Sequence, residues 1–347
     1  MDREKAWRFI EHFTDMAAGT TTIALLAVAD RTGLLTAMAG RGPMTTGDVS
    51  AAAGLEQRYV TEIMSGLAAG GVLAYDGSTE RFTLPDEHAA VVADDDSPYA
   101  MVGWLDMLPA TMHQLDHIVD ATRHGGGVPF EDFGEDMVRG IDRGNSPSMR
   151  LLLTRKWLSA MPDIVEQLET GGSIADVGCG SGAAVLAMAT AYPEATVWGF
   201  DLHHGSVERA RARARRVPNA RFEVRAADDL PLDVGFDLVT TFDVVHDLAD
   251  PPGALRRIKE SLVTGGTYLM MEPRAEDNLE DNLNPRGALL YGVSALHCMT
   301  QSLAMGGAGL GAAWGPAAAE ALCRDAGFGS FTELPIDNPF SAFYRVG

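Results

Sequence analysis

The sequence predicts an α/β protein in which a doubly wound parallel sheet follows an N-terminal helical module of winged-helix type. Two observations predict this fold class. From residue 172 onward, short apolar strands alternate with helical segments. Before residue 96, apolar residues recur at helical spacing and then give way to two short strands around a turn. Because 347 residues exceed the usual size of one domain, we expect three parts, at residues 1–95, 96–167 and 168–347.

Residues 1–95 carry the elements of a winged helix in order. Three helices and two strands are expected at 23–38, 45–54, 56–69, 72–75 and 81–84. The third helix lies where a DNA-binding module would place its recognition helix, but it offers a single basic residue, Arg58, beside Glu56, Gln57 and Glu62. This composition favours a platform that pairs two subunits or covers a site over one that binds DNA. We therefore expect a homodimer joined through this region.

The composition excludes several classes of function. The net charge is −21, from 27 Lys and Arg against 48 Asp and Glu. Such a charge repels nucleic acid phosphates and anionic membranes, so we expect a small-molecule substrate and neither nucleic acid nor membrane as partner. No apolar run approaches membrane length and no leader is visible, which predicts a cytoplasmic protein. Cys179, Cys298 and Cys323 are too few and too scattered for a disulfide framework or a cysteine-type zinc site.

The middle of the chain, residues 94–167, has a helical pattern that is interrupted at 125–129 and 145–147. We expect this segment to supply the walls of a substrate pocket. Aromatic and methionine side chains recur along it at Trp104, Met107, Met112, Met149 and Trp157. A stripe of this kind is more often core than pocket, so no single residue of it is assigned a role.

Strands and helices alternate through the rest of the chain. The strands are expected at 174–177, 197–200, 222–225, 236–242, 267–272, 331–334 and 342–346. Ligands of doubly wound sheets bind outside the carboxyl ends of the strands. In this sequence Gly178, Asp201, Asp228 and Asp243 all fall at such ends, so we expect them at one edge of the sheet.

A glycine run, Asp176-Val-Gly178-Cys-Gly180-Ser-Gly182, lies between the first strand and an alanine-rich helix at 183–191. Alternating glycines let the backbone approach a ligand closely, and Asp201, followed by Leu202, suits two ribose hydroxyls. These residues indicate a nucleoside cofactor. The spacing G-x-G-x-G after an acid differs from the dinucleotide fingerprint. It resembles motif I of the Rossmann-like class I S-adenosylmethionine (SAM) methyltransferases, in which Asp176 would attract the ammonium of the methionine moiety.

Four further positions complete the expected cofactor site. Asp228-Asp229-Leu230 resembles the acidic motif that hydrogen-bonds the adenine amino group while an apolar neighbour covers the ring, and either aspartate could do so. An exposed acidic turn is the alternative interpretation. Asp243 ends the fourth strand and lies where the transferred methyl group would face the substrate.

His246-Asp247 follows the fourth strand and is the best catalytic candidate. A histidine near neutrality can take a proton from a phenol or an enolisable carbon, or ligate a metal, and an adjacent carboxylate can orient it or share the ligation. His297 lies on an expected helix beyond the fifth strand. By itself it would more often be a core histidine.

Together these stretches resemble the winged-helix class of small-molecule SAM methyltransferases, from about residue 24 to the C-terminus. His246-Asp247 falls where plant-type O-methyltransferases of this class carry His-Asp and use the histidine as a general base. A second set of features is similar to an actinobacterial branch that includes α-keto acid C-methyltransferases of the phenylpyruvate type, which place a metal between two histidines. These features lie at 279–282, 297–300, 306–311 and 314–315. The resemblance implies His246 and His297 as metal ligands, with Asp247 as a third ligand or a neighbouring partner.

The first functional hypothesis is therefore a SAM-dependent methyltransferase of secondary metabolism that C-methylates an α-keto acid with the help of one divalent or ferric ion, iron or zinc. The alternative is an O-methyltransferase of a phenolic or polyketide-like hydroxyl, with His246 as the base. A winged-helix, ligand-responsive regulator is a hypothesis of another class, against which the net charge speaks. A protein that binds SAM without transferring its methyl group is a further alternative, which an intact His246 makes less attractive.

Overall fold

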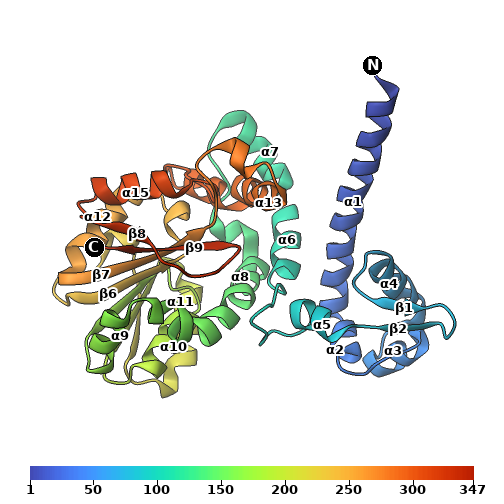
Figure 1. The fold of residues 1–347 in the computed structure, drawn as a ribbon, viewed down its shortest axis with the longest axis horizontal. Coiled ribbons are helices and arrows are strands. Elements are labelled where there is room, and N and C mark those ends of the chain that lie inside the picture. The colour runs from blue at the N-terminus through green and yellow to red at the C-terminus, as the bar shows by residue number, and fades with distance from the viewer. The chain divides into compact units, whose positions relative to one another are not determined.

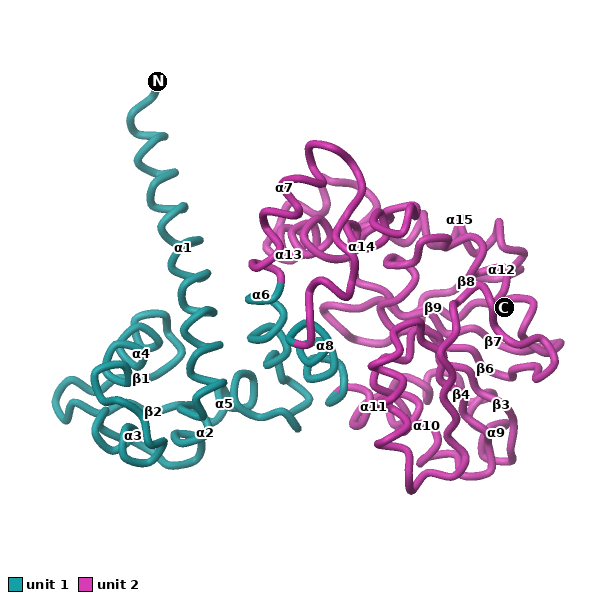
Figure 2. The backbone as a smooth tube through the Cα atoms, turned by 180° about the vertical axis from the view of Figure 1, so that it is seen from behind, with its two compact units in different colours: residues 1–110, 136–147 teal, residues 111–135, 148–347 magenta.

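The computed structural model describes residues 1–347, which form two compact units (Figures 1 and 2). Unit 1 comprises residues 1–110 and 136–147, and unit 2 comprises residues 111–135 and 148–347. The expected middle segment is thus divided between the two units instead of standing as a part of its own. No helix combines the length and the apolar character that crossing a bilayer requires.

Unit 1 is built from helices and one small hairpin. Its elements are α1 (Arg3–Arg31), α2 (Leu34–Met38), α3 (Thr46–Ala53), α4 (Gln57–Ala69), β1 (Ala74–Asp76), β2 (Arg81–Thr83), α5 (Asp86–Val92), most of α6 (Trp104–Met112) and most of α8 (Gly134–Ser148). The hairpin pairs Tyr75 with Phe82 in antiparallel register. On α4, Arg58 pairs with Glu62, which reduces the positive charge of that helix face. The helix–helix–hairpin order of a winged helix is therefore confirmed.

The single helix predicted at 23–38 is wrong in two respects. It is interrupted at Gly33, whose φ of 75° is left-handed, so α1 ends before it and α2 begins after it. In addition, α1 begins at Arg3, where Asp2 caps it by accepting from the backbone N–H of Glu4. The first turns, whose apolar side chains are exposed, lie outside the range that the sequence predicted.

A buried carboxylate explains why part of α8 belongs to unit 1. Asp106 on α6 is 1% exposed and lies 2.6 Å from Arg139 and 2.8 Å from Arg143. Arg143 also contacts Asp30 at 2.8 Å and Asp95 at 2.8 Å. These contacts tie α1, α6 and α8 together through charges that compensate one another.

Unit 2 contains a sheet of seven strands in the order β5-β4-β3-β6-β7-β9-β8. The strands are β3 (Ser173–Val177), β4 (Thr196–Asp201), β5 (Ala220–Val224), β6 (Phe236–Phe242), β7 (Leu262–Pro273), β8 (Phe331–Glu333) and β9 (Ser341–Val346). The first five are parallel, and β9 is antiparallel to both β7 and β8. All seven predicted strands are present, although β7 begins at Leu262 instead of residue 267.

Helices cover both faces of this sheet (Figure 1). One core layer packs η2, α9, α10 and α11 against the sheet, and the other packs α12 and α15. The bounds are η2 (Met149–Trp157), α9 (Pro162–Glu169), α10 (Ala183–Ala191), α11 (His204–Arg213), α12 (Pro251–Ser261) and α15 (Pro316–Asp325). Because the strands of such a sheet are buried on both faces, they read as continuous apolar runs. The doubly wound fold class is confirmed.

The chain reverses its direction across the sheet between β3 and β6. From β3 the chain adds β4 and β5 on one side, and it then returns to add β6 and β7 on the other. The carboxyl ends of β3 and β6 therefore lie side by side at the switch point, where open α/β sheets bind their ligands.

Candidate active site

The glycine loop after β3 packs directly on the segment that follows β6. Gly178 has a φ of 71°, and a Cβ placed on it would lie 2.5 Å from Cγ2 of Val244. Gly182 has a φ of 85° and begins α10. Gly180 also has a left-handed φ, and a Cβ placed on it would have no atom within 4 Å. The loop thus needs glycine for its backbone conformation, and open space remains beside Gly180.

Asp201 holds the glycine loop in place. Its Oδ2 accepts from the backbone N–H of Gly180 at 2.8 Å, and its Oδ1 accepts from that of His203 at 2.8 Å. A carboxylate has lone pairs beyond these two, so ribose hydroxyls are still within its capacity. The next side chain, Leu202, is 63% exposed and is available to cover a ligand.

Asp176 is an almost fully buried acid at the end of β3. It is 2% exposed, and its Oδ1 accepts from the hydroxyl of Thr240 at 2.7 Å. Burial, together with the charge of Asp201, raises the pKa of Asp176 to about 7, although the Thr240 bond opposes this rise. A cation in contact with this carboxylate would relieve the cost of burying its charge.

The acidic turn Asp228-Asp229 forms η5 (Ala227–Asp229). Asp229 accepts from Arg225 through its backbone oxygen at 2.9 Å and through its carboxylate at 3.3 Å. Asp228 is exposed and makes no such contact, which leaves it as the freer of the two candidates. Leu230 is fully buried in the core, so its side chain packs against the protein.

His246 lies just after β6, on the short helix η6 (Val245–Asp247), and is 3% exposed. The strand ends at Phe242, and Asp243 then turns the chain with a φ of 57°. Nδ1 of His246 lies 2.6 Å from Oε2 of Glu272, and Nε2 lies 3.3 Å from Oδ1 of Asp247. Burial raises the pKa of Asp243 to about 7.

Glu272, near the end of β7, is a site residue that sequence reasoning missed. Its Oε1 accepts from the backbone N–H of Val245 at 2.9 Å and from that of Val244 at 3.3 Å. Its Oε2 also accepts from the indole N–H of Trp314 at 3.2 Å. The sequence signal that could have identified Glu272 is its place at the carboxyl end of the strand that lies next to β6. Glu272 therefore holds both the backbone of η6 and the ring of His246.

The pKa values of the two histidines of the site are shifted in opposite directions. Burial disfavours the charged form of His246, but the carboxylates of Asp247 and Glu272 outweigh it and raise its pKa well above the usual value. Burial lowers the pKa of His297, although Asp247 opposes this change. We therefore expect a protonated His246 and a neutral His297 in the unliganded protein.

The structure adds Cys298 to the predicted metal set. His297 and Cys298 lie on η8 (Ser294–Cys298), a short π-helix of the kind found at functional sites. Ligand atoms of His246, Asp247 and Cys298 lie within 4.8 Å of one another, and His297 is outside this group. However, Nδ1 of His297 and Oδ1 of Asp247 are both buried without a hydrogen-bond partner. Burial raises the pKa of Cys298 to about 12, which keeps it a thiol.

Comparison with known proteins identifies the class. Residues 168–309 match the family model of a methyltransferase domain, and residues 20–94 match that of an Rv2258c-like winged HTH domain. The chain therefore combines a methyltransferase domain with an N-terminal winged HTH domain, and human N-acetylserotonin methyltransferase has the same fold. This finding confirms the class that the sequence predicted.

The relatives span different shares of the chain. An uncharacterized 37.1 kDa protein in a transposon of Streptomyces fradiae is 30% identical over 48% of each chain. The 3-hydroxy-5-methyl-1-naphthoate 3-O-methyltransferase of Streptomyces sahachiroi is 25% identical over 82% of each chain. Human N-acetylserotonin methyltransferase shares the fold, with a TM-score of 0.69 and 21% identity over 98% of this chain and 97% of that one. The chain covers 48% and 41% of the length of the first two curated relatives.

Proposed function

We propose that the protein transfers the methyl group of SAM to a hydroxyl oxygen of a small aromatic or polyketide-like molecule. The observation that carries this proposal is the buried His246–Glu272 pair, which lies after β6 where the glycine loop packs. The relatives support oxygen as the acceptor, because the Streptomyces sahachiroi protein is named for 3-O-methylation of a naphthoate. An O-methyltransferase from neocarzinostatin biosynthesis, with a TM-score of 0.63 and 22% identity over 94% of this chain and 95% of that one, was solved with 1,4-dihydroxy-2-naphthoic acid.

The residues of the glycine loop suit SAM. Gly180 leaves space beside the loop, and Asp176 is a buried carboxylate that a cationic ligand would stabilise. We propose that Asp176 receives the ammonium, that Asp201 receives the ribose, and that Asp228 or Asp229 receives the adenine amino group. Asp243 would then lie near the sulfonium. When bound, SAM supplies an electrophilic methyl group.

His246 would act on the acceptor. In the neutral form of His246, Glu272 keeps the proton on Nδ1, so Nε2 is the atom that would remove the hydroxyl proton. The resulting oxyanion would attack the methyl carbon in line while the methyl–sulfur bond breaks and S-adenosylhomocysteine leaves, and the rate would depend on alignment and on exclusion of water. Asp247 would stabilise the imidazolium that forms.

We predict that the affinity for SAM depends on pH through Asp176. The ionised carboxylate binds the ammonium, so affinity should rise as Asp176 loses its proton, whose pKa is about 7. Between pH 5.5 and 7 we expect an increase of about tenfold, with a decline once the amine of SAM deprotonates near pH 8. Calorimetric titration with SAM across this pH range measures the affinity.

Asp176→Asn should bind SAM more weakly and lose this pH dependence, whereas Asp233→Asn, an exposed position, should behave as the parent. An unchanged slope in Asp176→Asn would show that another group carries the effect.

A second candidate function is the metal-assisted C-methylation of an α-keto acid, which the named relatives do not support. One observation favours this second candidate. Oδ1 of Asp247 and Nδ1 of His297 are buried without a hydrogen-bond partner, and Asp247 belongs to the group with His246 and Cys298. Nitrogen, sulfur and carboxylate donors suit iron or zinc. His246, Asp247 and Cys298, whose ligand atoms lie within 4.8 Å of one another, would hold the ion, and His297, which lies outside this group, would be a further ligand. A bound metal would stabilise the enol form of a chelated keto acid.

Metal content and product analysis separate the two candidates. Tag-free protein purified without chelators is analysed for metals beside His297→Ala and Cys298→Ser. The parent is then incubated with SAM and with hydroxynaphthoic acids or 2-oxo acids, and the methylated atom is located by NMR. The O-methylation proposal expects methoxy products and no dependence on metal. Stoichiometric metal that is lost in the variants, with methyl groups on the β-carbon of 2-oxo acids, would establish the second candidate instead.

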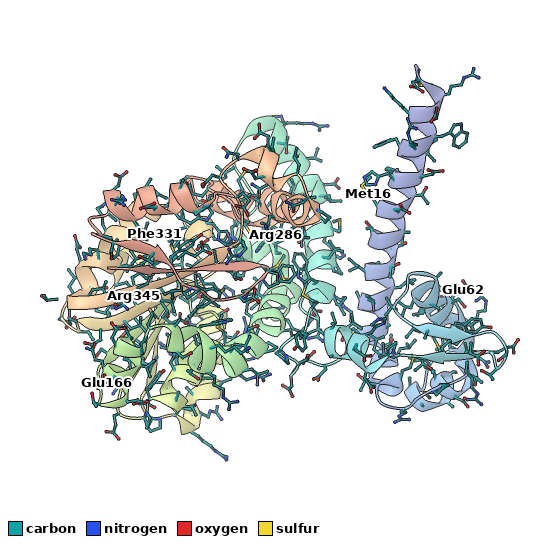
Figure 3. The ribbon with its side chains drawn as sticks, in the orientation of Figure 1. Met16, Glu62, Glu166, Arg286, Phe331 and Arg345 are labelled. Atoms are coloured by element: carbon teal, nitrogen blue, oxygen red, sulfur yellow. The ribbon has the colours of Figure 1, made fainter.

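We also propose that α1 pairs two copies of the chain. Phe9, Phe13, Met16 and Ile23 recur at helical spacing on one face of α1 and are 37–62% exposed; Figure 3 labels Met16 among them. This half of α1 extends beyond the rest of unit 1 (Figure 2), so its apolar stripe needs a cover from outside the unit. A second copy offers the same stripe for isologous pairing.

Sedimentation of the full chain tests this pairing. We expect a dimer for the parent and a monomer for the Phe9→Ser, Phe13→Ser double variant. Glu11→Gln, on the opposite face of α1, should remain dimeric. A monomeric parent at micromolar concentration would refute the proposal.

A further inference from the structure

The helix α14 (Met299–Ala304) carries a buried amide without a partner. Gln301 is 6% exposed, and its Nε2 donates to no group of the protein. Buried side-chain polar atoms without a partner number five in the chain, and three of them belong to Asp247, His297 and Gln301. A buried donor left unpaired costs stability, so such groups are retained where a ligand completes them.

The direction of Gln301 follows from its place on the helix. Gln301 lies four residues after His297 and three after Cys298, so its side chain leaves the helix between theirs. Cys298 lies with His246 and Asp247. The amide therefore extends from the face that carries the other groups of the candidate active site.

The two residues that flank Gln301 on α14 each form a hydrogen bond with another segment of the chain. The hydroxyl of Thr300 accepts from the backbone N–H of Val128 at 2.9 Å. The hydroxyl of Ser302 donates to the backbone oxygen of Leu248, just after η6, at 2.8 Å. Gln301 thus lies between the loop at 127–133 and the end of η6, and neither of them supplies an acceptor for its amide.

The loop at 127–133 brings aromatic rings to the same place. A Cβ on Gly127 would lie 1.8 Å from the backbone oxygen of Thr300, so the loop rests tightly on α14. Phe133 meets the ring of His297 edge-on at 4.7 Å, and Phe130 lies 6.0 Å from His297 and 5.4 Å from His203. Two aromatic rings therefore lie against His297, four residues before Gln301 in the chain.

We propose that Gln301 determines specificity by donating a hydrogen bond from Nε2 to a carboxylate oxygen of the acceptor, next to the hydroxyl that is methylated. The substrate class is then an aromatic hydroxy acid, whose ring lies against Phe130 and Phe133. This inference rests on the proposed function, because it concerns the acceptor at His246. A site with a buried donor discriminates strongly against an analogue that lacks the matching oxygen.

A matched pair of ligands tests the inference. Binding of 3-hydroxy-2-naphthoic acid and of 2-naphthol, which lacks the carboxylate, is measured by calorimetry on the full chain saturated with S-adenosylhomocysteine. We expect the parent to prefer the acid by about tenfold or more. Gln301→Met, which is similar in size and has no donor, should lose this preference without weakening the binding of 2-naphthol. Gln301→Glu should reverse the preference by repelling the acid.

The controls separate this inference from the proposed function. Gln57→Met, on the exposed surface of α4, should bind as the parent does. Equal preference in the parent and in Gln301→Met, or binding of neither ligand by the parent, would overturn the inference even if methyl transfer to other acceptors is observed. Preserved preference for the acid without any methyl transfer would instead refute the proposed function. Unchanged melting and S-adenosylhomocysteine binding in the variants establish that they are folded.

Discussion

Replacement of His246 by alanine is expected to lower kcat by about 10²–10⁴-fold, because general-base catalysis contributes an effect of this size. The side chain lies 3.3 Å from Asp247 and 2.6 Å from Glu272, and its ligand atom lies within 4.8 Å of that of Cys298. SAM affinity should change little, since the glycine loop and Asp201 do not contact the ring. Initial rates with the methylated acceptor and calorimetric binding of SAM provide the two measurements.

The pH dependence of the parent gives an independent readout. Because the pKa of His246 is raised well above its usual value, the neutral form that can accept a proton grows as pH rises. The rate at low acceptor concentration should therefore increase through neutrality into the alkaline range. The same raised pKa stabilises the fold at low and neutral pH, and this contribution is lost as pH rises through the pKa of the folded state.

His124→Ala serves as the control, because His124 is exposed on α7 (Leu115–His124) and pairs only with Asp120. It should retain the rate and the pH profile of the parent. A fully active His246→Ala variant would exclude His246 as the base.

The second large effect is expected for Glu272→Gln. Both oxygens of Glu272 accept hydrogen bonds, from the backbone of η6 and from the side chains of His246 and Trp314. A glutamine has only one side-chain oxygen. Its amide N–H₂ would therefore face donors that accept no hydrogen bond and that the second oxygen of Glu272 pairs in the parent. Leaving such buried donors unsatisfied should cost about 2–5 kcal/mol, which corresponds to a midpoint of thermal unfolding lower by about 5–15 °C.

Activity should fall together with stability in this variant, since the tautomer and orientation of His246 are no longer held. Trp314→Phe keeps the ring and removes one donor, so a smaller loss of about 1 kcal/mol is expected. Glu333→Gln, at the half-exposed contact with Arg274, is the control and should unfold as the parent does. Wild-type stability and rate in Glu272→Gln would contradict the role assigned to Glu272.

Much of unit 2 could be predicted from the sequence because its signals are local. Each parallel strand is a short apolar run followed by a turn, so β3, β4 and β6 were found near their observed bounds. The glycine loop was found for the same reason, since a left-handed backbone at Gly178 and Gly182 requires the residue that the sequence shows. The extent of α1 was missed, although apolar residues recur at helical spacing along its exposed part.

The sequence by itself determined the sheet, the glycine loop and the pairing of His246 with Asp247, because these depend on neighbouring residues in the chain. Tertiary structure alone decided the partners of that pair. Glu272 comes beside His246 because β7 lies next to β6, and Cys298 and Gln301 come from a helix that follows β7. A side chain's electrostatic environment depends on distance in space, and Glu272, 26 positions away in the chain, contributes to that of His246 beside the neighbouring Asp247.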